Sequence, residues 1–262
     1  MSSTLERTFA ILEYLSGLPD GATLIAIADD LQVPRSACHR LLAEMVRCGY
    51  LRQLRSYGDY ALTTKLAALG LSYLSKSGIV DIAQPLIDGV AHASGELVRL
   101  AIVDGERLTF VAKAQGARFG LRYDPDMGLD VRLSCSAGGH AWLMTLSHER
   151  VAEIVMKQGF GTPQNFGPKA PTTLKALMKL LQADRKRGFS IISEMYSPGM
   201  SAMAAPVQRA GEAAIGVITI AGPLIRLTEQ RMLELAPRLL AAAAELAMTS
   251  STSALFSRNP QA

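Results

Sequence analysis

The sequence is poor in cysteine, in charged residues and in long apolar runs. Its three cysteines, Cys38, Cys48 and Cys135, are an odd number without the spacing of a metal site, which favours a reduced, cytoplasmic protein over a disulfide-linked one. No apolar stretch approaches the roughly 20 residues that a membrane span needs. The start, Met1–Glu6, lacks the basic and apolar blocks of a signal peptide. The sequence therefore predicts no membrane partner and no export.

Charged residues make up 19% of the chain, whereas hydrophobic residues reach 49%. A chain of this length and composition can form two domains with buried cores. The net charge is +4, but residues 1–31 carry one arginine against five acidic residues, and residues 32–57 carry five arginines against Glu44. A basic block that follows an acidic one is expected of a surface that docks on phosphate, although a solvated basic face has the same composition.

The first 62 residues have the element order of a winged helix-turn-helix. Apolar residues at helical spacing predict helices over 3–16 and 24–31, and Pro34 suits the first position of a third helix. Two short strand-like runs, Tyr50–Leu54 and Asp59–Leu62, then predict a hairpin, the wing. Two helices, a turn, a polar-faced helix and a hairpin are the elements of this DNA-binding motif.

The third helix presents arginines on the face opposite its apolar stripe. In helix-turn-helix proteins the first turn of the recognition helix meets base edges, and arginine is the commonest reader of guanine. Arg35 and Ser36 lie in that first turn, and Arg40 follows one turn later. The alternatives are a solvated Arg40 and a His39 that only packs against the turn. The predicted DNA contacts, with phosphate favoured for those nearest the wing, are Arg35, Ser36, Ala37, His39, Arg40, Arg47, Arg52, Arg55 and Tyr57.

Beyond residue 62 the pattern changes to mixed α and β. Residues 63–77 predict one helix that links two domains. Further helices are expected at 79–94, 138–146, 149–158, 172–187 and 228–248. Strands are expected at 97–103, 107–114, 118–123, 190–193, 201–208 and 214–221.

Several short runs, taken together, resemble the IclR family of bacterial transcription regulators. In the N-terminal part these are Leu24–Leu31, Val33–Leu42, Gly49-Tyr50 and Tyr60–Leu62. In the C-terminal part they are Ser134–Ala141, Arg187–Ser190, Glu194, Gly199, Ala204–Pro206 and Ile220–Pro223. Each run is weak alone, but their order and spacing are specific, and the resemblance covers nearly the whole chain.

The resemblance implies an α+β protein that regulates transcription as a repressor or an activator. Residues 1–62 are expected to form the winged helix-turn-helix and 63–77 the linker helix. Residues 78–250 are expected to form a mixed α/β effector-binding domain with a curved antiparallel sheet, similar to GAF and PAS domains, and 251–262 a flexible tail. Members typically dimerise through the N-terminal part and often form tetramers. The implied partners are double-stranded operator DNA, a small organic acid, and further copies in a homodimer or homotetramer.

The run from Ser134 to Gly138 is the candidate effector site. Its hydroxyls and backbone N–H groups converge at the positive end of a predicted helix, where a carboxylate can bind. An ordinary serine cap with glycines for close packing is the alternative. Arg122 is either a counter-ion or a sheet-edge charge, and His140 either lines the pocket or faces solvent. The candidate contacts, several of them placed by the resemblance, are Arg122, Ser134, Ser136, Ala137, Gly138, His140, Ile192, Met200, Ala202, Thr219 and Ala221. Because several are apolar, an acid with a hydrophobic or aromatic body is favoured over one of two or three carbons.

Two other classes of protein are alternatives to a regulator that binds an organic acid. An enzyme would use Cys135 as a nucleophile, but no general base stands near it in the sequence, and His140 would be poorly aimed. A redox- or metal-responsive regulator would use Cys38, Cys48 and Cys135, but Cys38 falls on the apolar stripe and none has a histidine at ligand spacing. We therefore expect no catalytic site, no metal site and no cofactor.

Overall fold

The computed structural model describes residues 3–54, 58–125, 131–162 and 164–249. The chain divides into two compact units, Met1–Tyr73 and Leu74–Ala262. The division falls inside the helix that the sequence predicts as a linker. The tip of the predicted wing, with Arg55 and Tyr57, and the predicted tail at 251–262 lie outside the described residues.

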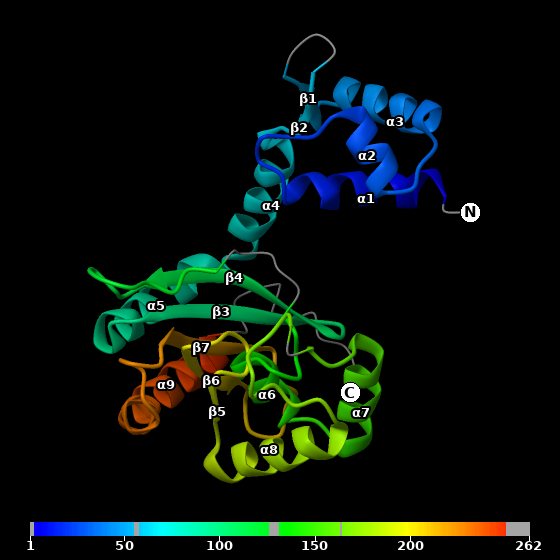
Figure 1. Ribbon diagram of the computed structural model, residues 1–262. Helices are drawn as coiled ribbons and strands as arrows, with labels where there is room; N and C mark the ends of the chain where they lie inside the picture. Colours follow the sequence, from blue (N-terminus) through cyan, green and yellow to red (C-terminus); the bar gives the residue numbers. More distant parts are fainter. Residues whose placement is uncertain (1–2, 55–57, 126–130, 163, 250–262) are drawn as a thin grey trace. The chain divides into compact units, whose positions relative to one another are not determined.

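The first unit has the predicted winged helix-turn-helix order (Figure 1). Its elements are α1 (Thr4–Ser16), α2 (Leu24–Asp30), α3 (Arg35–Arg47), β1 (Leu51–Gln53) and β2 (Tyr60–Leu62). Thr23 caps α2 as predicted, because its side-chain oxygen accepts a hydrogen bond from the backbone N–H of Ala26. Pro34 is the N-cap of α3 rather than its first residue. β1 and β2 pair antiparallel, and a small core that includes Ile11, Ile27 and Leu42 holds the helices together.

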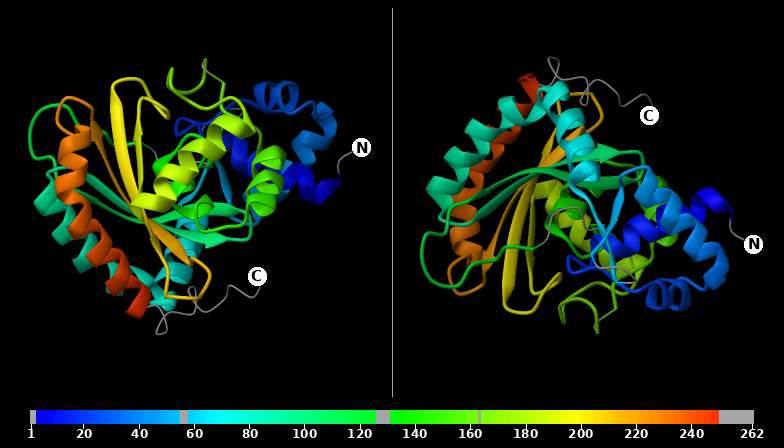
Figure 2. Two further views of the ribbon diagram at one scale, coloured as in Figure 1. Left: turned by 90° about the horizontal axis from the view of Figure 1, so that it is seen from below. Right: turned by 90° about the horizontal axis from the view of Figure 1, so that it is seen from above.

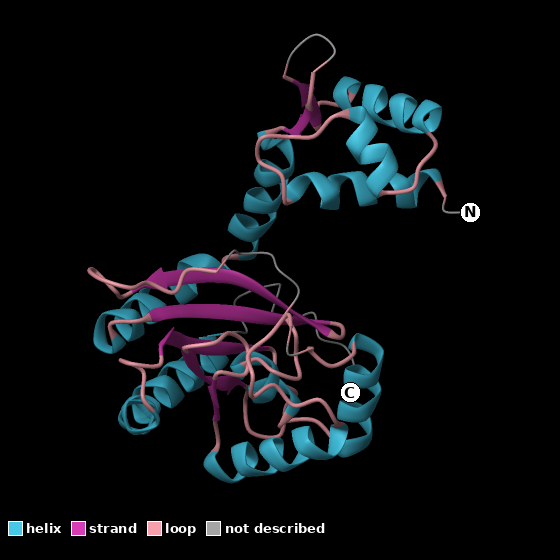
Figure 3. Ribbon diagram, in the orientation of Figure 1, coloured by secondary structure: helices cyan, strands magenta, loops and turns pink. Residues whose placement is uncertain are grey.

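The second unit is a five-stranded antiparallel sheet with helices on both faces (Figures 2 and 3). α4 (Thr64–Ser77) leads into α5 (Ile79–Ser94), β3 (Leu97–Asp104), β4 (Arg107–Gln115), α6 (Ala137–Leu143), α7 (His148–Gln158), α8 (Leu174–Arg187), β5 (Ser190–Ser193), β6 (Met200–Val207), β7 (Gly216–Pro223) and α9 (Glu229–Thr249). The strand order is β4-β3-β7-β6-β5, and every neighbouring pair is antiparallel. Within the described ranges no single helix is long and apolar enough to cross a membrane, and the bent pair α4 and α5 meets that test only when taken together.

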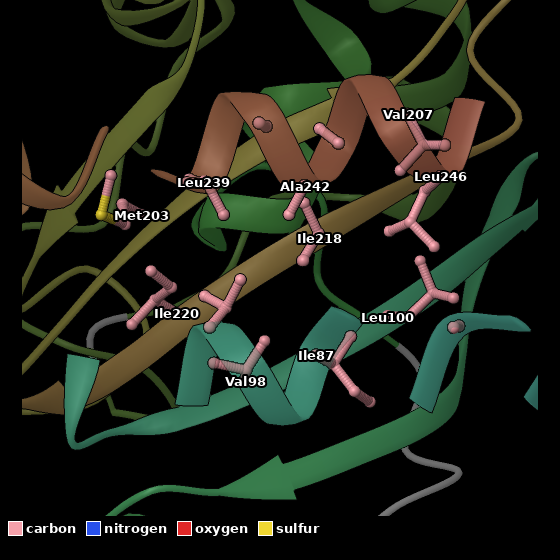
Figure 4. Packing of buried hydrophobic residues seen from close by; sticks show 14 of the residues in the cluster. Ile87, Val98, Leu100, Met203, Val207, Ile218, Ile220, Leu239, Ala242 and Leu246 are labelled. Atoms are coloured by element: carbon pink, nitrogen blue, oxygen red, sulfur yellow. The ribbon is translucent and has the colours of Figure 1, made fainter. Parts of the chain in front are cut away.

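The two faces of the sheet pack against different helices. α5 and α9 cover one face, where Val98 and Leu100 of β3 and Ile218 and Ile220 of β7 share one buried cluster with Ile87 of α5 and Leu239 of α9 (Figure 4). α6, α7 and α8 lie on the other face. Because both faces are covered, every residue of β7 is buried. The sheet therefore has one closed apolar side and one side on which α6 and its preceding loop lie.

The strand predicted at residues 118–123 is wrong. These residues form a loop after β4, and Phe119 and Leu121 are 88% and 65% exposed. Side chains take its backbone acceptors: Arg226 Nη2 donates to Leu121 O at 2.9 Å, and Gln115 Nε2 donates to Tyr123 O at 3.1 Å. Alternating apolar residues mimic a strand, but this segment has no neighbouring strand to pair with.

Candidate functional site

The recognition helix α3 has the predicted division into a buried and an exposed face. Cys38, Leu42 and Met45 are buried. The exposed side carries Ser36, His39, Arg40, Ala43 and Arg47, while Ala37 is half-buried. The helix thus offers polar and basic side chains to the solvent while its apolar stripe fixes it to the rest of the unit.

The arginines of this surface differ in what they touch. Arg35 pairs with Asp29 at 3.2 Å, and Arg47 with Glu44 at 2.6 Å, all on exposed side chains. The Arg47 guanidinium lowers the pKa of Glu44. Arg40 is exposed and, among the described residues, has no ion pair or hydrogen-bond partner for its side chain. Arg52 of β1 is likewise exposed, and its side chain has no such partner among the described residues. Arg40 can therefore bind a base or a phosphate without breaking an existing contact.

Arg40→Ala is expected to weaken specific operator binding by about 1–3 kcal/mol, the usual value of a side chain that contacts a base edge. Folding should be unchanged because the side chain is exposed. Fluorescence anisotropy with operator and with scrambled DNA measures both affinities. Arg52→Ala is the matched comparison, expected to weaken both DNAs about equally. Unchanged operator affinity in Arg40→Ala would contradict the orientation of α3.

The second unit contains a cavity on the sheet face that carries α6. It holds about 640 Å³ of space free of protein atoms, part of which is open to solvent. Its lining residues are Arg99, Phe110, Tyr123, Pro125, Val131, Ser136, Ala137, Gly138, Ile192, Tyr196, Ser197, Met200, Ser201, Ala202, Thr219 and Ala221. The structure thus brings together the start of α6 and all the later-strand residues that the sequence nominated.

The close packing of α6 on the sheet explains its two glycines. A Cβ atom on Gly138 would lie 3.3 Å from Val217 Cγ2 and 3.4 Å from Thr219 Cγ2 on β7. One on Gly139 would collide with the backbone of Leu133. Ser136 is the N-cap, and its Oγ accepts from Gly139 N at 3.1 Å. The hydroxyl of Ser136 is therefore already engaged as an acceptor, as in the alternative of an ordinary cap.

His140 neither lines the cavity nor faces solvent. It is fully buried, with Nδ1 3.1 Å from Asp184 Oδ2 and Nε2 2.9 Å from the carbonyl oxygen of Ser134. Arg187 donates to the other oxygen of Asp184 at 2.8 Å. Ser134 is also buried, outside the cavity lining. These side chains fasten the loop before α6 to α8, so their place in the structure is a supporting one.

The arginine that reaches the cavity is Arg99, which the sequence analysis did not single out. Arg122, the arginine predicted there, is exposed outside the lining and donates to Arg118 O at 3.0 Å. Arg99 lies on β3 with its guanidinium 3.8 Å from the centroid of the Phe110 ring. The sequence does contain a signal for this arginine: within Leu97–Val103, Arg99 is the one charged residue in an otherwise apolar run.

Burial shapes the electrostatics of this cavity. It lowers the pKa of the Arg99 guanidinium, and the nearby phenols of Tyr123 and Tyr196 partly oppose that shift. Burial also raises the pKa of the Tyr123 phenol. An arginine stays protonated under such a shift. The cavity therefore offers one positive charge in largely apolar surroundings.

The cysteines differ sharply in accessibility. Cys38 and Cys135 are buried, and Cys48 is exposed. Burial raises the pKa of the Cys38 thiol and raises that of Cys135 to about 12, so both stay thiols near neutral pH. Among the residues that the structure describes, no group of three His, Cys, Asp or Glu side chains is placed to hold a metal ion.

Iodoacetamide at pH 8 is therefore expected to modify Cys48 rapidly and to leave Cys38 and Cys135 unmodified while the protein stays folded, because the thiolate is the reacting form. Mass spectrometry of tryptic peptides locates the modified residues. Alkylation in urea is the control and should reach all three. Rapid modification of Cys135 in the folded protein would revive the hypotheses of a nucleophile or a redox sensor.

Two family models match the chain. The model of the bacterial transcriptional regulator IclR C-terminal domain matches residues 71–248, and that of the IclR helix-turn-helix domain matches residues 4–55. The chain belongs to the IclR family. It is thus a transcription regulator with a helix-turn-helix DNA-binding domain.

Similar proteins agree with this assignment. Transcriptional repressor IclR of Escherichia coli strain K12 is 26% identical over 246 residues, which are 94% of this chain and 89% of that protein. The HTH-type transcriptional repressor AllR of the same strain is 26% identical over 230 residues, 88% of this chain and 83% of that protein. Both are repressors by name, which favours a regulator over an enzyme.

Solved structures of the family share the fold. An IclR transcriptional regulator from Alicyclobacillus acidocaldarius has a TM-score of 0.80 and 20% identity, covering 95% of this chain and 98% of that one. An IclR homologue from Microbacterium hydrocarbonoxydans, complexed with 4-hydroxybenzoate, has a TM-score of 0.76 and 21% identity, covering 94% and 98%. The described α+β architecture is therefore that of the family.

Proposed function

We propose that this IclR-family regulator binds double-stranded operator DNA through α3 and the wing, and that a small organic acid bound in the second unit modulates that binding. The observation that carries the second part is the cavity, with apolar walls, a few hydroxyl groups and one partly buried arginine. Concave apolar sites with a few convergent polar groups are where small ligands bind. The regulator acts in the cytoplasm, where its operator lies.

The walls of the cavity favour an acid with a hydrophobic or aromatic body. Val131, Ile192, Met200 and Ala221 contribute apolar surface, and such surface stabilises a ligand roughly in proportion to the apolar area buried. The Microbacterium homologue of the same fold was solved with an aromatic acid, 4-hydroxybenzoate. Both observations support an aromatic acid over one of two or three carbons.

The regulator is proposed to work as a homodimer assembled through its first unit, with a tetramer as the larger alternative. Leu5 and Phe9 on α1 are 62% and 53% exposed, and Leu69 and Leu71 on α4 are 51% and 67% exposed. Large apolar side chains exposed on two helices of one unit are candidates for a protein interface. A second copy of the chain fits because paired operator half-sites call for a two-fold symmetric reader.

A thermal-shift screen of organic acids on the full chain tests the effector. An acid at 100 times its Kd stabilises the folded state by about 2.7 kcal/mol through mass action. Each stabilising acid is then added to the complex with an operator found by in vitro selection. An acid that stabilises the protein must also change the operator Kd, and stabilising acids that all leave DNA binding unchanged would refute the proposed modulation.

A further inference from the structure

Arg99 stands out among the residues of its strand. Its neighbours Val98 and Leu100 point into the core under α5 and α9, so Arg99 points to the opposite face, as strand alternation requires. There it is paired across the strands with Thr219 of β7, and both line the cavity. A position in the middle of a sheet with two covered faces is normally apolar.

The guanidinium of Arg99 has no acceptor among the described residues. Its Nε is buried without a hydrogen-bond partner. Asp124, one of the acidic groups near it, is paired with Lys113 at 2.8 Å. Desolvating a charge without a partner is unfavourable, and nearly all buried polar groups in native proteins are hydrogen-bonded. An anion that enters the cavity would supply the missing partner.

We propose that Arg99 is the residue that binds the carboxylate of the effector, and that the effector is a monocarboxylic acid with a flat, largely apolar body. This inference rests on the proposed function and deepens it. The ring of Phe110 stacks on the guanidinium at 3.8 Å and so fixes its plane, which leaves the N–H edge to receive both carboxylate oxygens.

The charge of the lining limits the effector to one carboxylate. Among the described lining residues, Arg99 is the one with a charged side chain, and the other polar ones are hydroxyl-bearing, such as Tyr123, Ser197 and Thr219. A second carboxylate would be desolvated without a cation, which is unfavourable. A neutral hydroxyl substituent, in contrast, can pair with these hydroxyl groups. The start of α6 is a weaker candidate, because α6 is one seven-residue helix and Ser136 already caps it.

Titration calorimetry on the full chain tests the assignment with benzoate, 4-hydroxybenzoate and phenylacetate, their amides, and terephthalate. The monocarboxylates should bind at least tenfold more tightly than the amides and than terephthalate. Arg99→Met should weaken the best acid about 10- to 150-fold, as expected for the loss of a charge-assisted hydrogen-bonded pair. Arg99→Lys keeps the positive charge but lacks the planar guanidinium that binds both carboxylate oxygens. Its affinity for the acid should lie between that of the parent and that of Arg99→Met. Arg118→Met is the matched control, since Arg118 is exposed outside the cavity lining, and should bind like the parent.

A second readout does not depend on the ligand. Without ligand, Arg99→Met should melt at the same temperature as the parent or higher, because it removes a half-buried charge that has no partner among the described residues. Parent-like affinity in Arg99→Met, or equal affinity of the parent for acid and amide, would overturn the role of Arg99 and leave the proposed function standing. If none of the three monocarboxylates binds the parent protein while another organic acid does, the ligand class is wrong. If no organic acid binds, the proposed function fails together with this inference.

Discussion

Raising the salt concentration from 50 to 200 mM is expected to weaken operator binding about a thousandfold. Residues 32–57 carry five arginines in each chain. If about three of them contact phosphate in each half of a dimer, the complex has about six phosphate contacts. At roughly −0.9 for each contact, the logarithm of the binding constant then falls with the logarithm of the salt concentration with a slope near −5. The physical cause is the release of counterions from the phosphates that the arginines neutralise.

The ion pairs on this surface do not prevent that effect. Arg35–Asp29 and Arg47–Glu44 are exposed pairs, which contribute little to stability and can be exchanged for phosphate. Anisotropy titrations at four or more salt concentrations give the slope. Arg52→Ala should make it shallower by about one unit, whereas Lys175→Ala, on the exposed side of α8, should leave it unchanged. A parent slope shallower than about −2 would show that the basic block does not bind phosphate.

Arg226→Met is expected to destabilise the protein by about 3 kcal/mol, near the lower end of the range for breaking a buried ion pair. Arg226 donates from Nε and Nη2 to the two oxygens of Glu96 at 2.7 and 2.9 Å. The Glu96 side chain is 5% exposed and that of Arg226 is 37% exposed. Without Arg226 the carboxylate stays buried with no cation, and the partial exposure of the site keeps the effect from being larger.

Urea denaturation measures this loss, and a double variant identifies its cause. Glu96→Gln combined with Arg226→Met should recover part of the stability, because no unpaired charge is then buried. Arg231→Met is the control: its pair with Glu234 has side chains 43% and 51% exposed, so a cost below about 1 kcal/mol is expected. Equal stability of Arg226→Met and the parent would mean that Glu96 finds another partner or is protonated.

The sequence predicted the elements whose patterns are local. Strand β5 was placed at its exact bounds and most helices to within a few residues, since periodicity, caps and glycines act over one or two turns. The strand at 118–123 failed because a strand also needs a partner, and this segment is not part of the five-stranded sheet.

The site was harder to predict for the same reason. The predicted effector contacts included Arg122, in the supposed strand at 118–123, and did not include Arg99. The lone charge of Arg99 in an apolar run is visible in the sequence, but interpreting it requires knowing that both faces of the sheet are covered, which depends on helices that begin as far as 130 residues later, at Glu229. His140 likewise finds its partner Asp184 44 positions away. Residue types were therefore readable from the sequence, whereas their partners were not.

The loop after β4 is attached by a different kind of contact from the sheet beside it. Lys113, Gln115 and Arg226 hold it through side chains, at Asp124, Tyr123 O and Leu121 O. Three such contacts at the surface break with far less free energy than a buried strand ladder, so amides of this loop should exchange with solvent through local opening while β7 stays protected. Because Tyr123 lines the cavity, local opening of this loop would remove part of the cavity wall without global unfolding.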